Sequence, residues 1–174
     1  MINLIEKDVL FGRVMKINEK EAIIQLKDNK VIGLYTDTVM GIGCFYENID
    51  NLYQLKKRDK NKKIIALIYS IEQIPNLDEK IKNKIIKYWP GPVTFIYNDQ
   101  GYRIPNNKKL LKLLEKIKKP LFVTSANISG EKECINDIQI FEKFKIDCFD
   151  NKEKESNIPS TIYLIKDNEF IKIR

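Results

Sequence analysis

Histidine is missing from this chain of 174 residues, which excludes Ser-His-Asp triads, histidine-ligated metals and imidazole acid–base catalysis. Cysteine is scarce: Cys44, Cys134 and Cys148 are an odd number without metal-ligand spacing, which predicts free thiols in a reducing compartment. No apolar run approaches the ~20 residues of a membrane span, and no signal segment is recognisable. We therefore expect a cytoplasmic protein with no membrane association.

Arginine is also rare, although the chain is basic. The net charge is +7, from 31 Lys and Arg against 24 Asp and Glu, and this excess suits a polyanionic partner such as nucleic acid or a phosphate-rich ligand. However, 27 of the cations are lysine, and Ile, Lys and Asn together make up 72 residues, so compositional drift explains much of the charge. The four arginines carry more information than the net charge: Arg13, Arg58, Arg103 and Arg174.

Hydrophobic periodicity predicts alternating helices and strands without an internal repeat or a linker. Asn18 and Glu21 have the spacing of a capping box at the start of the first helix, and residues 98–101 are expected to be the turn of a hairpin. The alternation and the hairpin together predict an α/β sandwich with a mixed sheet. The expected helices are 18–27, 48–57, 77–89, 107–118 and 136–144, and the expected strands are 30–35, 64–69, 93–97, 102–104, 121–124, 146–149, 161–165 and 169–174.

Serine and threonine total only ten, and they gather in short clusters beside glycine or proline. Residues 35–43 (Tyr-Thr-Asp-Thr-Val-Met-Gly-Ile-Gly) follow a predicted strand, where two hydroxyls around a carboxylate can fix a small polar ligand and the glycines permit tight turning. Taken alone, a strand-to-loop turn with local hydrogen bonds is the simpler interpretation. Residues 124–130 (Thr-Ser-Ala-Asn-Ile-Ser-Gly) carry more donors than a turn requires, which favours a nest for phosphate or ribose oxygens.

The other clusters combine cations, prolines and one tryptophan. Residues 56–63 hold six cations in eight positions, and Arg58 is the one that can bind phosphate bidentately, so this segment is either a phosphate contact or a solvated face. Residues 89–95 (Trp-Pro-Gly-Pro-Val-Thr-Phe) are typical of a rigid structural corner before a strand. Ser160 enters a late strand after a proline, and Arg103 and Arg174 are its isolated candidate partners.

In this order the clusters resemble the YrdC family of L-threonylcarbamoyladenylate synthases, in its short, TsaC-type form. The shared motifs are Thr-Asp-Thr-Val, Lys-x-Arg, Trp-Pro-Gly-Pro-Val-Thr, Arg-x-Pro, Ser-Ala-Asn-x-Ser-Gly, Ser-Thr and a late arginine, which together cover residues 18–174. Each motif alone is weak, but the ordered set is specific. We expect one YrdC-like domain over residues 1–174, with residues 1–14 as an N-terminal extension outside the match.

The resemblance implies a nucleotidyltransferase that makes threonylcarbamoyl-AMP and pyrophosphate from L-threonine, bicarbonate or CO2 and ATP, with Mg2+ on the phosphates. The product would serve formation of N6-threonylcarbamoyladenosine in tRNA, which implies a downstream threonylcarbamoyl transferase complex and tRNA as partners. The implied fold is an open, twisted, mixed α/β sheet flanked by helices around a basic concave cavity. No catalytic residue and no metal-binding side chain is implied. The implied ATP-binding residues are Lys56, Arg58, Lys62, Ser125, Asn127 and Arg174, and the implied L-threonine-binding residues are Thr36, Thr38, Arg103, Val123 and Ser160.

Three positions depart from the family pattern, and one of them is Lys63, where proline is common. Tyr35 replaces a proline and Met40 replaces a tyrosine, so we expect a looser first loop and an altered ligand wall. The main alternative function is a non-catalytic protein of the same fold that binds tRNA or double-stranded RNA through its positive charge. Aromatic residues are not interleaved with the cations, which disfavours this alternative. A carbamoyl-adenylate domain of hydrogenase maturation is a further alternative, but that context normally adds acylphosphatase and zinc-finger segments.

Overall fold

The computed structural model describes residues 16–174, and the extension expected at residues 1–14 lies outside them. The helices of this part are α2 (Glu19–Lys27), α3 (Ile49–Lys56), α4 (Glu79–Ile85), α5 (Lys108–Ile117) and α6 (Asp137–Phe144). The strands are β1 (Lys16–Ile17), β2 (Ile32–Leu34), β3 (Gly41–Cys44), β4 (Ile65–Leu67), β5 (Val93–Tyr97), β6 (Gln100–Arg103), β7 (Leu121–Ser125), β8 (Cys148–Phe149), β9 (Thr161–Lys166) and β10 (Glu169–Lys172). The predicted alternation of helices and strands is confirmed.

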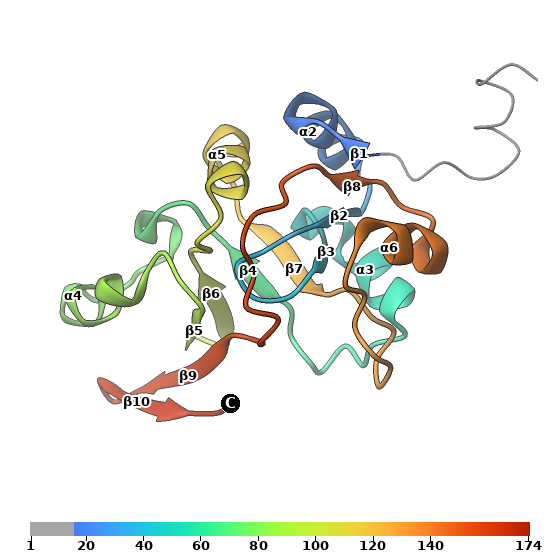
Figure 1. Cartoon of the computed structure of the whole chain (residues 1–174). Coiled ribbons are helices and arrows are strands. Elements are labelled where there is room, and N and C mark those ends of the chain that lie inside the picture. The colour runs from blue at the N-terminus through green and yellow to red at the C-terminus, as the bar shows by residue number, and fades with distance from the viewer. Residues whose placement is uncertain (1–15) are drawn as a thin grey trace, which may run out of the picture.

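The strands form one open, mixed sheet, in the spatial order β1-β8-β2-β3-β7-β4-β6-β5-β9-β10. The sheet contains parallel pairs, such as β4 with β6 and β5 with β9, and antiparallel pairs, such as β3 with β7 and β5 with β6. The edge strands β1 and β10 lie far apart, so the sheet does not close into a barrel (Figure 1). The expectation of a mixed, open sheet flanked by helices is therefore confirmed.

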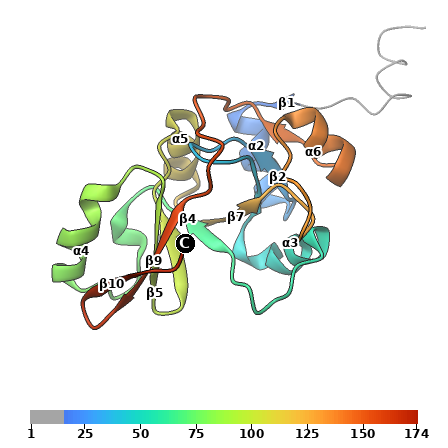
Figure 2. The ribbon, with the colours of Figure 1, turned by 60° about the horizontal axis from the view of Figure 1, so that its bottom comes forward.

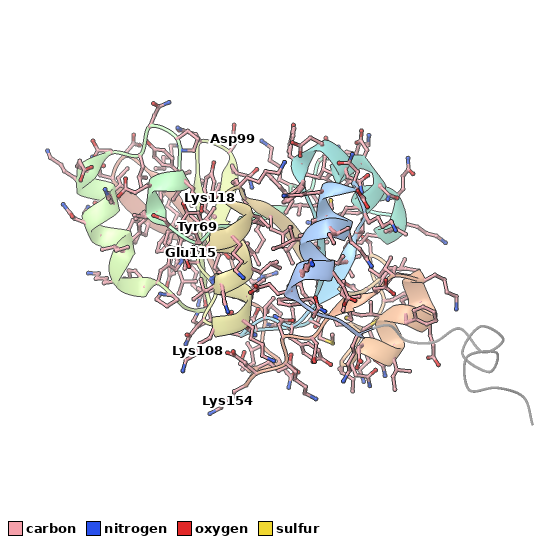
Figure 3. The ribbon with its side chains drawn as sticks, turned by 90° about the horizontal axis from the view of Figure 1, so that it is seen from above. Tyr69, Asp99, Lys108, Glu115, Lys118 and Lys154 are labelled. Atoms are coloured by element: carbon pink, nitrogen blue, oxygen red, sulfur yellow. The ribbon has the colours of Figure 1, made fainter. Side chains whose placement is uncertain are left out.

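Helices cover both faces of the sheet. On one face, Leu26 of α2 and Leu113 of α5 belong to the same buried cluster. Figure 3 looks down on these two helices, with Glu115 labelled on α5 and Lys118 directly after it. On the other face, α3, α4 and α6 contribute Leu52, Ile85 and Ile140 to a second cluster. Burial of apolar surface on both sides of the sheet is the main stabilising term for such a layered fold.

The helix starts follow local capping rules. The Asn18 side chain accepts from the backbone N–H of Glu21 at 3.0 Å, and the Glu21 carboxylate accepts from the backbone N–H of Asn18 at 2.8 Å. This is the predicted capping box, and it satisfies two N–H groups that the first turn of a helix leaves without a partner. Asn107 caps α5 in the same way, by accepting from the backbone N–H of Leu110 at 2.9 Å.

The segment 35–43 departs from its prediction as a single loop with turning glycines. The loop ends at Met40, and Gly41 and Gly43 lie inside β3, between β2 and β7. A Cβ atom at Gly41 or Gly43 would lie 2.6 or 2.7 Å from a methyl group of Val123 on β7. These glycines therefore allow close approach of two strands, and the tight-turn explanation is wrong.

The Trp-Pro-Gly-Pro segment forms the expected structural corner. The indole N–H of Trp89 donates to the carbonyl of Val93 at 2.6 Å, and the ring packs edge-on against Phe95 with 5.6 Å between centroids. The preceding helix is shorter than predicted, because α4 ends at Ile85 and a 3-10 turn follows it. Within residues 16–174, no helix is long and apolar enough to cross a membrane.

Candidate active site

A cavity of about 160 Å³ lies where the first loop, β7, the end of β6 and the start of β9 meet. In Figure 2, β4, β7 and β9 and the chain end marked C lie around the centre of the molecule. Most of the predicted site residues converge on this cavity, although they are far apart in the sequence. Eight of the eleven line it: Thr36, Thr38, Arg58, Arg103, Val123, Ser125, Ser160 and Arg174.

Arg103 forms a buried ion pair at the end of β6. Its Nη1 donates to Oδ1 of Asp37 at 3.0 Å, and the two side chains are only 3% and 9% exposed. Burial lowers the pKa of Arg103, Asp37 opposes this effect, and Arg174 adds to it. Nε of Arg103 and Oδ2 of Asp37 are buried and have no hydrogen-bond partner within residues 16–174, so the pair keeps at least one unused donor and one unused acceptor.

The threonines of the first loop form a small hydrogen-bond chain. The Thr36 hydroxyl donates to the carbonyl of Val39 at 2.7 Å, and it lies 2.9 Å from the Thr38 hydroxyl. Because a hydroxyl has only one proton, the hydroxyl of Thr38 must donate to that of Thr36. The lone pairs of Thr38 are then left as acceptors at the cavity, where they suit an ammonium group.

Ser160 also lines the cavity, where two polar side chains contact its hydroxyl. Its hydroxyl lies 2.9 Å from the hydroxyl of Thr94 on β5, and Nη2 of Arg174 donates to it at 3.4 Å. Arg174 also donates from Nε and Nη2 to the Ser160 carbonyl, at 3.1 and 3.0 Å. Backbone hydrogen bonds with Ile162 hold the main chain of Arg174, and the bonds to the Ser160 carbonyl hold its guanidinium.

Arg58 completes a group of three arginines at the cavity. Its guanidinium donates to the carbonyls of Lys62 and Lys63, at 2.8 and 3.2 Å, which folds the basic loop around the side chain. Burial lowers the pKa of Arg58, and the nearby charge of Arg174 lowers it further. Since Arg174 has the same effect on Arg103, it repels both of the other guanidinium groups, and an anion bound among them would offset this repulsion.

Three of the predicted ATP-binding residues do not line the cavity: Lys56, Lys62 and Asn127. The ammonium of Lys56 donates to the Ser125 carbonyl, the Asn127 carbonyl and the Asn127 side-chain oxygen, at 2.5, 2.7 and 2.9 Å. Burial, followed by the charge of Arg58, lowers the pKa of Lys56 to about 8. The exposed Lys62 contributes its carbonyl to Arg58 and to the Tyr53 hydroxyl.

Asn151 is the main structural residue of the site that the sequence did not reveal. It is fully buried, and its side chain accepts from the Tyr35 N–H at 2.9 Å and donates to the Tyr35 carbonyl at 2.8 Å. The segment that follows Asn151 lies beside the first loop, because the N–H of Ser156 donates to the Asp37 carbonyl at 3.0 Å. In a chain with sixteen asparagines, nothing in the residue type or its spacing distinguished this position.

The two departures in the first loop, Tyr35 and Met40, have different consequences. Tyr35 points away from the cavity, and its hydroxyl donates to Asp137 of α6 at 3.3 Å. Burial and the Asp137 charge raise the pKa of Tyr35 to about 12. This bond and the two hydrogen bonds from Asn151 to the Tyr35 backbone hold the first loop in place, so the expectation of a looser loop is wrong. Met40, in contrast, lines the cavity.

Metal-ligating residues are not clustered in this part of the chain. Within residues 16–174, no three His, Cys, Asp or Glu side chains lie close enough together to hold a metal ion. Glu133 contributes a carboxylate to the cavity lining, beside cations from Arg58, Lys63, Arg103 and Arg174.

Comparisons with known proteins show the family of this chain. Residues 25–174 match the family model Sua5_yciO_yrdC, described as "Telomere recombination". The chain is 32% identical over 140 residues to the threonylcarbamoyl-AMP synthase of Aliivibrio fischeri (strain ATCC 700601 / ES114), covering 67% of the chain and 76% of that protein. It is also 32% identical over 176 residues to "Uncharacterized protein MG259" of Mycoplasma genitalium, covering 91% of the chain but only 38% of that longer protein.

A solved structure shares the fold. The crystal structure of P. abyssi Sua5 complexed with L-threonine superposes with a TM-score of 0.81 at 23% identity, covering 92% of this chain and 57% of the Sua5 chain. At this level of identity, the likeness establishes the fold.

Proposed function

The chain belongs to the Sua5/YciO/YrdC family, and on that premise we propose that it is an L-threonylcarbamoyladenylate synthase acting in the cytoplasm. One observation carries the proposal. Three of the four arginines converge with the clustered hydroxyls on one cavity, in a chain where lysine is otherwise the default cation. Such a site suits an anionic nucleotide beside a small zwitterion.

L-Threonine would occupy the part of the cavity nearest the first loop. Arg103 pairs with its carboxylate, and the acceptor lone pairs of Thr38 receive the ammonium. Thr36 and Ser160 line the same part, and the backbone of Val123 forms the floor. Nη1 of Arg103 is already paired with Asp37, so the remaining N–H groups of the guanidinium would bind the L-threonine carboxylate, in a buried place where water screens charge weakly.

ATP would occupy the side where Arg58, Ser125 and Arg174 meet. Two guanidinium groups match the geometry of phosphate oxygens, and the Ser125 hydroxyl, which donates its proton to Asn127, can accept a hydrogen bond from a ribose hydroxyl. Mg2+ is expected on the phosphates, because it keeps several waters and needs only one or two carboxylates from a protein. Glu133 is a candidate for that single carboxylate.

The reaction requires alignment and charge neutralisation. The L-threonine amine forms a carbamate, with bicarbonate by loss of water or with CO2 by loss of a proton. A carbamate oxygen then attacks the α-phosphorus of ATP, forming the P–O bond to threonylcarbamoyl-AMP as the bond to pyrophosphate breaks. Negative charge develops on the equatorial and leaving oxygens, where preorganised arginines stabilise it. Such a step does not need a histidine, which fits the composition.

The test is pyrophosphate release by the purified protein supplied with ATP, Mg2+, bicarbonate and L-threonine. We expect release that depends on all of the substrates, and threonylcarbamoyl-AMP detectable by mass spectrometry. Omission of L-threonine is the matched control. Pyrophosphate release that does not depend on L-threonine would refute the proposal. Transfer of the product to tRNA by a threonylcarbamoyl transferase complex would then place the protein in tRNA modification.

A further inference from the structure

Lys56 lies at the end of α3 and is only 1% exposed. A lysine ammonium has three N–H donors and no acceptor. Its three donors are matched by three acceptors on one turn, the Ser125 carbonyl, the Asn127 carbonyl and the Asn127 side-chain oxygen, at 2.5, 2.7 and 2.9 Å. A phosphate could receive a hydrogen bond from Lys56 only if one of these short bonds broke.

The turn that Lys56 holds is built around the Asn127 side chain. The Ser125 hydroxyl donates to the Asn127 side-chain oxygen at 2.7 Å, and the amide nitrogen of Asn127 donates to the carbonyls of Ile128 and Glu131 at 3.1 and 3.0 Å. A backbone bond from the N–H of Ser129 to the carbonyl of Lys56, at 2.9 Å, ties the turn to α3. The polar atoms of Asn127 are thus used inside the protein, whereas Ser125 faces the cavity.

The two cations of the Lys-x-Arg motif, Lys56 and Arg58, point in different directions. Lys57 adopts the left-handed conformation, with φ 49° and ψ 42°, which ends α3 and changes the direction of the chain. Lys56 consequently points into the protein, toward the turn at Ser125, while Arg58 points to the cavity. The charge that can meet a phosphate belongs to Arg58.

We propose that Lys56 is a positioning residue, which shapes the nucleotide-binding wall by holding the Ser125–Asn127 turn and does not itself bind phosphate. This role rests on the proposed function, because it concerns the ATP side of the same cavity. The lowered pKa agrees with it: burial and Arg58 oppose the charge of Lys56, Glu133 and Cys134 favour it, and at a pKa of about 8 the ammonium is still charged at neutral pH.

A series of ligands with increasing numbers of phosphates separates positioning from phosphate binding. Dissociation constants for adenosine, AMP and ATP are measured by calorimetry for the wild-type protein, Lys56→Met and Arg58→Met. If Lys56→Met distorts the wall, the dissociation constants of all three ligands should rise by a similar factor, about tenfold for the loss of roughly one hydrogen bond. Arg58→Met should leave the affinity for adenosine nearly unchanged and lower the affinity for ATP most, because Arg58 would contact the phosphates.

Two further variants control the experiment. Lys60→Met removes a lysine from the same basic loop, but this side chain is 68% exposed and paired with Asp50, so no change in affinity is expected. Asn127→Ala breaks the turn without changing charge, and it should reproduce the uniform loss seen for Lys56→Met. Asn127→Ala also provides the test if Lys56→Met does not fold.

The outcomes separate this role from the proposed function. If Lys56→Met weakens ATP strongly but leaves adenosine unchanged, the lysine binds phosphate and the positioning role is wrong, while the proposed function stands. Unchanged adenosine affinity in Asn127→Ala would overturn the role in the same way. If the wild-type protein binds none of the three ligands, the proposed function falls, and the role of Lys56 falls with it.

Discussion

The buried ion pair between Asp37 and Arg103 holds one wall of the cavity, and removal of its negative charge should destabilise the protein. Asp37→Asn keeps the size and shape of the side chain but leaves the guanidinium of Arg103 without the carboxylate that lies 3.0 Å from its Nη1. Because Arg103 and Asp37 are only 3% and 9% exposed, water cannot easily take the place of the lost charge.

Breaking a buried pair by removing one partner typically costs about 3–5 kcal/mol of unfolding free energy. The amide of the variant can still accept a hydrogen bond from Arg103, so we expect a value of about 3 kcal/mol, at the low end of that range. For a domain of this size, each kcal/mol corresponds to roughly 2–4 °C in melting temperature, which predicts a fall of about 6–12 °C.

Urea unfolding and thermal melting of the wild-type protein and Asp37→Asn provide the assay. Asp50→Asn is the matched control, because it makes the same chemical change at a carboxylate that is 71% exposed and paired with Lys60 at 2.7 Å. An exposed pair contributes about 0–1 kcal/mol, so the control should barely change stability. If Asp37→Asn costs no more than Asp50→Asn, the buried pair does not stabilise the site and the reasoning is wrong.

A double variant separates the lost interaction from the cost of an unpaired charge. Asp37→Asn combined with Arg103→Gln removes both charges, so it should recover part of the stability lost in the single variants, with a coupling of about 2 kcal/mol. Pyrophosphate release by this double variant, measured with saturating ATP, should nevertheless show a strongly raised KM for L-threonine. The reason is that Arg103, which would pair with the L-threonine carboxylate, is no longer present. Additive stability losses would contradict a direct interaction between the two residues.

Three further predictions concern other parts of the site. Arg58→Lys keeps the charge but loses the planar group that matches phosphate, so kcat/KM for ATP should fall at least tenfold; a change below twofold would contradict the bidentate role. Gly41→Ala places a methyl group 2.6 Å from Val123, so it should cost about 2 kcal/mol in urea unfolding, and Val123→Ala in the same chain should recover part of that loss. The pKa of Lys56 is about 8 in the folded protein, below the ordinary 10.5, so the unfolded chain binds more protons between these values. The unfolding free energy of the wild-type protein should therefore rise relative to that of Lys56→Met as the pH increases from 8 to 10.5, and a parallel pH dependence of the two proteins would show that Lys56 does not titrate in this range.

Local sequence signals predicted the elements whose causes are local. The capping box of α2 and the amphipathic pattern of α5 depend on residues three or four positions apart, and both elements formed as expected. Strand β3 was not predicted, because two of its four residues are glycines, which are poor strand formers. Glycine is needed at these two positions because Val123, about eighty residues later in the chain, packs against them. No local sequence pattern could predict that contact.

The sequence by itself predicted eight of the residues that line the cavity. In a chain where drift has made lysine the default cation, the few arginines and clustered hydroxyls marked positions at which a particular chemistry is needed, and most of them line one cavity. The tertiary structure alone decided what each of them contacts. Asp37 meets Arg103 across 66 residues, and Lys56 meets the Ser125 turn across 69. The order of strands in the sheet sets these distances, so spacing along the chain could not show that Lys56 points inward while Arg58 lines the cavity.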